Sequence, residues 1–161
     1  MLIYGLTLLG IVHTIVSLVA VAAGAILLIR DGKISWDSSL GKTYVITTII
    51  VCLTGFGIFQ HGGFGKPHAL GIITLVTLGV IAAATQNKFG KASAYVVTIG
   101  YTTTFFFHIV PGITETATRL PYGAPWAANG EDPNVKMLIG IAFVLYLIGA
   151  VVQYRKMKKS V

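Results

Sequence analysis

The sequence predicts an all-α fold, an integral membrane bundle of five transmembrane helices that forms a single domain over residues 1–161. Hydrophobic residues make up 55% of the chain and charged residues only 11%, whereas soluble domains carry about 25% charged residues. The apolar residues form runs of about 18 or more with hardly a charge, which is the length needed to cross the hydrocarbon core. The Lys and Arg residues lie between these runs, as topology signals do, and leave no surface stripe for nucleic acid. We therefore exclude a nucleic-acid-binding protein and treat membrane lipid as the solvent.

The first two spans follow from the first two apolar runs. The first span is expected over residues 2–29. No Lys or Arg precedes it, and it is too long for the hydrophobic region of a cleaved signal peptide, so we interpret it as a retained helix. The second span is expected over residues 40–60, where any of the polar residues 37–39 can cap the first turn. The only cysteine, Cys52, lies inside this run, so no internal disulfide forms.

Prolines mark the start of the third span and the end of the fourth. The third span is expected over residues 68–86, directly after Pro67. Proline suits the first helical position because the amide hydrogen it lacks would have no partner there. The fourth span is expected over residues 92–110, and we expect Pro111 to kink or end it.

The longest polar stretch separates the fourth span from the fifth. Residues 111–134 are expected to form an outer loop, and the fifth span is expected over residues 135–153. Asp132 and Pro133 suit the N-cap and first helical position of this last helix. The chain has no internal repeat, so one helical bundle is the simplest architecture.

The distribution of basic residues predicts the topology. Five spans place the two termini on opposite sides, and cytoplasmic loops carry an excess of Lys and Arg. With the C-terminus inside, nine of the twelve basic residues are cytoplasmic: Arg30, Lys33, Lys42, Lys88, Lys91, Arg155, Lys156, Lys158 and Lys159. The three that remain outside are Lys66, Arg119 and Lys136. We therefore predict a multi-pass protein of the bacterial inner (cytoplasmic) membrane, N-out and C-in.

All four histidines fall in the outer half of the predicted bundle. His61 and His68 flank the turn between the second and third spans, and His108 lies near the outer end of the fourth. His13 lies about ten residues into the first span, or roughly 15 Å deep at 1.5 Å per residue. His13 and His108 each share a helix face with small or hydroxyl-bearing residues. If these faces turn inward, the four rings converge on one outer-leaflet cavity.

These residues have both a structural and a functional interpretation. Neutral imidazole is a common ligand of haem iron, zinc and copper, but interfacial histidines also simply hydrogen-bond across helices. Glu115 and Arg119 are spaced i, i+4 with the acid first, which favours an ion pair on a helix. The alternative makes Glu115 a further ligand or proton acceptor and Arg119 a clamp for a carboxylate or haem propionate.

Short motifs are spread over most of the chain: His13, the stretch Leu40-Gly-Lys-Thr-Tyr44, the turn from His61 to His68, and Phe-Phe-His-Ile-Val-Pro-Gly-Ile-Thr-Glu-Thr-Ala-Thr-Arg-Leu-Pro at 106–121. In these motifs the chain resembles small bacterial membrane proteins of the DUF2306 type. Such proteins are loosely similar in layout to b-type cytochromes of the cytochrome b561 kind, whose four-helix cores hold haem between paired histidines. The resemblance implies one haem at most, because the chain lacks the inner-leaflet histidines that a second haem would need.

From these observations we predict a membrane redox protein that exchanges electrons with quinone or with a periplasmic redox protein. Haem b is expected between His13 and His108, with His68 as the reserve ligand and Arg119 at a propionate. A zinc, copper or iron ion is the alternative, bound by members of the outer group: His13, His61, His68, His108 and Glu115. Rival classes are a metal-binding transporter, a zinc hydrolase, and a structural subunit of a larger membrane complex or homo-oligomer. The sequence assigns no catalytic residue.

The topology can be tested with reporters. A reporter enzyme fused after Val161 should be active only in the cytoplasm, and a tag at Gly130 should react with an impermeant label added to intact cells, because of the bias in basic residues. Labelling of Gly130 only after the inner membrane is opened would reverse the predicted orientation.

Overall fold

A computed structural model describes residues 7–59 and 63–159, which contain helices and connections but no strand. The helices in chain order are α1 (Leu8–Asp31), α2 (Ser39–Gly55), α3 (Lys66–Thr85), the short 3-10 helix η1 (Gly90–Ala92), α4 (Ser93–Arg119) and α5 (Pro133–Lys159). Four helices are long and apolar enough to cross a membrane, namely α1, α3, α5 and α4 with η1, whereas α2 is a shorter apolar helix. The all-α, membrane-type fold is therefore confirmed, while the fifth span and the orientation stay predictions.

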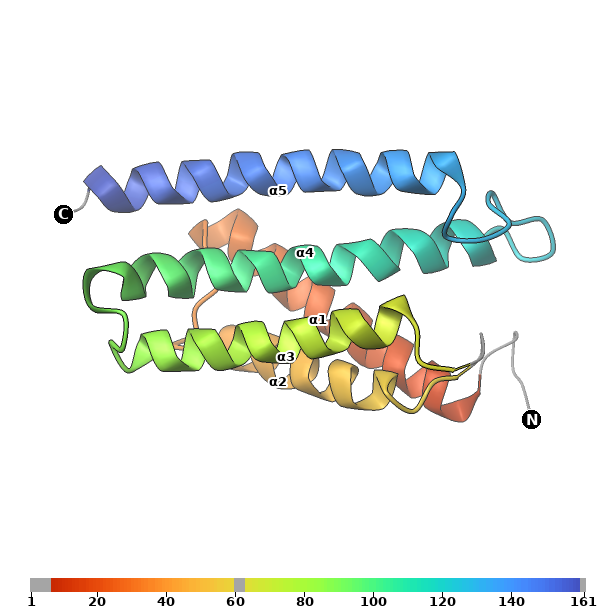
Figure 1. Ribbon diagram of the computed structural model, residues 1–161, viewed down its shortest axis with the longest axis horizontal. Helices are drawn as coiled ribbons and strands as arrows, with labels where there is room; N and C mark the ends of the chain where they lie inside the picture. The colour runs from red at the N-terminus through yellow and green to blue at the C-terminus, as the bar shows by residue number, and fades with distance from the viewer. Residues whose placement is uncertain (1–6, 60–62, 160–161) are drawn as a thin grey trace.

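The helices are arranged with α4 in the middle of the bundle (Figure 1). The packed pairs are α1 with α2, α2 with α3, α3 with α4, α4 with α5 and α1 with α4. Figure 1 shows α5 lying along α4 at one edge, while α1 crosses the bundle obliquely. The α2–α3 turn and the α4–α5 loop lie at one end, called here the loop end. The opposite end holds the α1–α2 and α3–α4 connections and the end of α5, and is called the basic end.

The predicted caps are observed at two helices. At α2 the Ser38 hydroxyl accepts a hydrogen bond from the Gly41 amide at 3.0 Å. Before α5 the Asp132 carboxylate accepts one from the Asn134 amide at 2.8 Å, and the helix begins at Pro133. These caps satisfy amides that have no partner inside the helix, which fixes where each helix starts.

Pro111 does not end α4, so the predicted outer loop at 111–134 is too long. The helix runs through Pro111 to Arg119, and the connection to α5 shortens to residues 120–132. Proline removes one backbone hydrogen bond, but such a loss is tolerated inside helices of membrane proteins, where neighbours satisfy the freed groups. Residues 111–119 therefore add more than two turns to α4 at the loop end.

The ends of α2 and α5 also differ from the predicted spans. α2 ends at Gly55 rather than near residue 60, in a segment that also contains Gly57, and glycine is a poor helix former. α5 continues to Lys159 rather than 153. Lysines in the last turn interact favourably with the negative end of the helix dipole, so the basic tail extends the helix.

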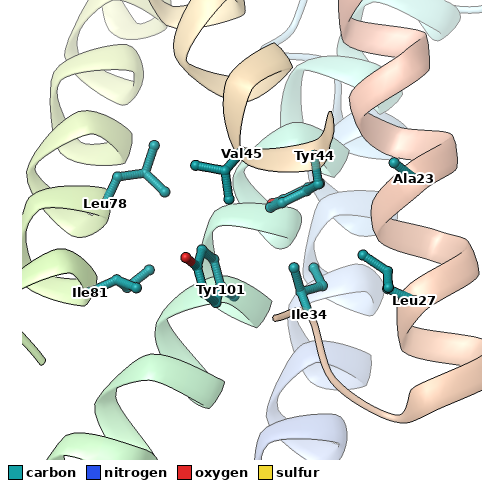
Figure 2. Close-up of a cluster of buried hydrophobic side chains, with 8 residues drawn as sticks. All are labelled: Ala23, Leu27, Ile34, Tyr44, Val45, Leu78, Ile81 and Tyr101. Atoms are coloured by element: carbon teal, nitrogen blue, oxygen red, sulfur yellow. The ribbon is translucent and has the colours of Figure 1, made fainter. Parts of the chain in front are cut away.

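The main core lies between α1, α2, α3 and α4 (Figure 2). Its buried side chains are Ala23, Leu27, Ile34, Tyr44, Val45, Leu78, Ile81 and Tyr101. α1 approaches closely at Gly24, where an added Cβ would lie 2.6 Å from the Phe105 ring and 2.9 Å from the Tyr44 ring. Only glycine permits this approach, and it brings α1 against both α2 and α4.

Candidate functional site

His108 lies on the inward face of α4 and is only 7% exposed. Its Nε2 atom lies 3.0 Å from the Thr48 hydroxyl oxygen on α2. Thr48 donates its single proton to the Tyr44 carbonyl oxygen at 2.7 Å, so its oxygen can only accept from the imidazole. His108 therefore carries its proton on Nε2 and its free lone pair on Nδ1.

His13 on α1 is hydrogen-bonded through its other ring nitrogen, Nδ1. Its Nδ1 atom lies 3.0 Å from the Thr54 hydroxyl oxygen, and Thr54 donates to the Ile50 carbonyl oxygen at 2.8 Å. The Nδ1–H of His13 is therefore the donor, and Nε2 keeps the lone pair. The face of α1 that His13 shares with small residues packs inward, as predicted: Gly10, Ala20 and Gly24 on this face are buried.

His13 and His108 lie at different depths in the bundle, although a haem held between them would need both rings at the same level. Their partners Thr48 and Thr54 are six residues apart on α2, which is about 9 Å along the axis and about 120° around it. His108 is the deeper of the two because α4 continues to Arg119. The rings still interact electrostatically, and His13 also interacts with the Glu115 carboxylate.

His68 lies apart from this pair and caps α3. Its Nδ1 accepts a hydrogen bond from the Gly65 amide at 3.2 Å, and its ring packs between Phe59 and Phe64 at centroid distances of 5.0 and 5.1 Å. Its Nε2 is buried and has no hydrogen-bond partner among the described residues. The contacts of His68 agree with its structural interpretation. His61 lies outside the described residues.

Glu115 and Arg119 form the predicted ion pair in the last turns of α4. The Arg119 Nε atom donates to a Glu115 carboxylate oxygen, and the Glu115 side chain is 51% exposed. Glu115 thus faces solvent at the loop end and interacts electrostatically with His13. It joins the histidine pair as a charged neighbour rather than as a third close ligand.

The donor atoms of these residues do not fit a bis-histidine haem. A histidine that ligates a metal donates its other ring N–H to a neighbour and binds through the free nitrogen. Only His13 presents Nε2 in this way, since His108 has Nε2 bonded to Thr48 and the lone pair of His68 accepts from Gly65. Over residues 7–59 and 63–159, no three His, Cys, Asp or Glu side chains gather closely enough to hold a metal ion. The haem and metal assignments therefore stay predictions.

The buried face of α4 is polar along most of the helix, and the sequence indicated only the part of this face that lies near His108. Six of its seven buried residues, here called the polar seam, carry a hydroxyl or an imidazole: Ser93, Thr98, Tyr101, Thr102, Thr104 and His108. The seam extends about 22 Å from Ser93 to His108 at 1.5 Å per residue. The cluster of threonines at residues 98–104 is the signal that could have revealed it.

Three members of the seam, Thr102, Thr104 and His108, form hydrogen bonds to other helices. The Tyr44 hydroxyl and the Thr104 hydroxyl lie 2.8 Å apart, and Thr104 donates its proton to the Tyr101 carbonyl, so Tyr44 donates to Thr104. Thr102 donates to Gln153 of α5 at 2.9 Å. Buried polar groups need such partners, because each unpaired one costs free energy.

Comparison of the chain with protein-family models, curated proteins and solved structures finds no match. The resemblance to DUF2306-type proteins and b-type cytochromes therefore stays a prediction.

Replacing Thr48 with valine tests the assigned hydrogen bond. Thr48→Val keeps the side-chain shape but leaves the His108 Nε2–H buried without an acceptor. We therefore expect the free energy of unfolding to fall by about 1–3 kcal/mol. Thr47→Val is the matched control, because the Thr47 hydroxyl bonds only to backbone carbonyls of its own helix. Thermal unfolding in detergent gives the stability, and ¹⁵N NMR of labelled histidines gives the tautomers. An Nδ1–H tautomer for His108 in the wild type would contradict the assignment.

Proposed function

We propose that the chain is a proton-transferring membrane protein in which His13 and His108 accept and release protons inside the bundle. The observation that carries this proposal is the polar seam, in which six of seven buried α4 residues are hydroxyls or an imidazole. Hydroxyl groups on such a face also join helices in a membrane, so the ionisable imidazole within it is what points to proton transfer. Chains of Asp, Glu and His side chains are typical of proton relays in membrane proteins.

The histidine pair supports this role better than a role in packing alone. Hydroxyl groups alone suffice to join helices, whereas an ionisable group within a membrane is costly and marks a functional site by default. Neutral imidazole carries one donor and one acceptor, so it takes up a proton on one nitrogen and releases one from the other. In His13 and His108 one nitrogen is fixed by a threonine, which leaves the other to accept.

Glu115 supplies the connection to solvent at the loop end. Its carboxylate is half-exposed and interacts electrostatically with His13, so it exchanges protons with water and stabilises a charged imidazole nearby. The ion pair with Arg119 orients the carboxylate. The proposed order from the loop end is therefore Glu115, His13, His108 and then the polar seam.

The proposal includes five spans with the N-terminus outside and the C-terminus inside, in a bacterial inner membrane. The basic end carries nine Lys and Arg residues and two aspartates, and the loop end carries three basic and three acidic residues. At the loop end the basic side chains are paired, Arg119 with Glu115, and Lys66 and Lys136 with Glu131. Hydrogen bonds from Lys66 and Lys136 hold the pKa of Glu131 at about 2, so this acid stays ionised. The charge asymmetry follows the positive-inside rule.

Proton flux into liposomes tests the proposal. Purified protein reconstituted with an internal pH dye should acidify the lumen faster than empty liposomes under an imposed gradient, and His108→Ala should reduce this flux at least tenfold by removing the buried acceptor. Thr104→Val should also reduce it, because the seam loses a hydroxyl. Thr103→Val is the matched control, since Thr103 lies on the same helix but bonds to Tyr146 of α5 outside the seam. Wild-type flux equal to that of empty liposomes, or equal effects of the two threonine variants, would refute the pathway.

A redox cofactor is a second candidate, and the orientation of His13 favours it. Thr54 accepts the Nδ1–H of His13 and so leaves Nε2 free, which is the arrangement of a metal-ligating histidine. This geometry supports one ligand for haem b or for a zinc, copper or iron ion, with quinone or a periplasmic redox protein as the electron partner.

An absorption spectrum and metal analysis of the purified protein distinguish the two candidates. A Soret band that disappears in His13→Ala and persists in Thr47→Val would support a haem on His13. Bound metal without that band would support an ion, and a colourless, metal-free protein with proton flux would eliminate the second candidate.

A further inference from the structure

A cavity of about 460 Å³ opens at the basic end, between the end of α1, the start of α4 and the last turns of α5. Three lysines line it: Lys33 after α1, Lys91 in η1 and Lys156 in α5. These residues are far apart in the sequence, so the fold gathers them rather than a local run of charge. None of the three histidines that the structure describes lines the cavity.

The wall of the cavity is fixed by a buried amide. Gln153 of α5 is 7% exposed, its Nε2 donates to the Gly32 carbonyl at 2.9 Å, and its Oε1 accepts from Thr102. Gly32 ends α1 with a φ of +70°, a conformation that favours glycine. These contacts set the position of the chain directly before Lys33 against α5.

The cavity has an excess of positive charge. Asp31 is its only acidic lining residue, and both oxygens of that carboxylate accept from the Arg30 guanidinium, at 2.7 and 2.8 Å. Neither Lys33 nor Lys91 forms an ion pair within the described parts of the chain. The Asp31 carboxylate also interacts electrostatically with Lys33, and the three lysines leave an excess of positive charge in the cavity.

We propose that this cavity binds the phosphate group of an anionic phospholipid. It lies where apolar helices end, at the level of lipid headgroups. Tyr95, which lines the cavity, packs against Tyr154 with the ring centroids 5.2 Å apart, and aromatic residues are enriched at membrane interfaces. Basic pockets between transmembrane helices recognise anionic headgroups, and lysine binds phosphate as a point charge. Tyr95 and Met157 supply apolar wall for the lipid backbone. The inference needs the helices to cross a membrane but depends neither on their orientation nor on proton transfer.

Native mass spectrometry of the full chain in neutral detergent tests the inference with three probes: phosphatidylglycerol, phosphatidylcholine and inorganic phosphate. Lys33→Gln combined with Lys91→Gln should weaken phosphatidylglycerol binding roughly 25-fold, since each lysine near a headgroup contributes about fivefold. The matched control is Lys42→Gln combined with Lys88→Gln, which removes the same charge at the same end outside the cavity. Ala94→Phe, which fills the cavity without changing charge, should also weaken binding.

Each outcome decides the proposal. Selective loss of phosphatidylglycerol in the cavity variants, with phosphatidylcholine bound weakly throughout, supports the lipid site. Binding of inorganic phosphate with the same dependence on Lys33 and Lys91 reassigns the cavity to a free anion and overturns the lipid proposal. Equal losses in the cavity and control lysine variants show a general charge effect and also overturn it. Melting temperatures without lipid establish that the variants are folded, which the exposed position of these lysines favours.

Discussion

The hydrogen bond from Tyr44 to Thr104 is the contact on which the rest of the bundle depends. Tyr44 is fully buried, its ring packs against α1 at Gly24, and its hydroxyl donates to α4. In lipid there is no hydrophobic force between helices, so close packing and such interhelical bonds hold them together. This bond fixes the rotation and register of α2 against α4, and with them the position of Thr48 opposite His108.

Because α2 is the shared partner, the two histidines are oriented by α2 rather than by each other. Thr48 and Thr54 each send their proton to a backbone carbonyl and accept from an imidazole, so α2 sets the tautomer of both rings. Thr48 and Thr54 lie on different faces of α2. The two imidazole rings are therefore close enough to interact electrostatically, but they do not face one point where both could bind the same iron. This geometry suits proton exchange between successive groups better than joint binding of one iron.

The sequence predicted what depends on local pattern and missed what depends on how helices sit against each other. Apolar runs located the helices, and short polar motifs located the caps at Ser38 and Asp132 and the pair Glu115–Arg119. His108 lies farther from the end of its helix than the predicted span implied, because α4 continues past Pro111, where the sequence predicted a kink or an end. The sequence predicted that all four histidine rings converge, but His68 lies apart from His13 and His108, and its lone pair caps α3. The spacing of residues along one helix shows which of them share a face. It does not show how that helix is rotated, or how far it is shifted along its axis, relative to a neighbouring helix.

Gln153 connects the two proposed sites. Its carbonyl oxygen accepts from Thr102 in the polar seam, and its amide nitrogen donates to Gly32 beside the basic cavity. An amide has a fixed donor end and a fixed acceptor end, so these two bonds are possible together in only one orientation of the side chain. The end of the seam and the wall of the cavity are therefore held by the same group. A displacement of Lys33 and the end of α1 would therefore also disturb the hydrogen bond to Thr102 in the seam through this amide.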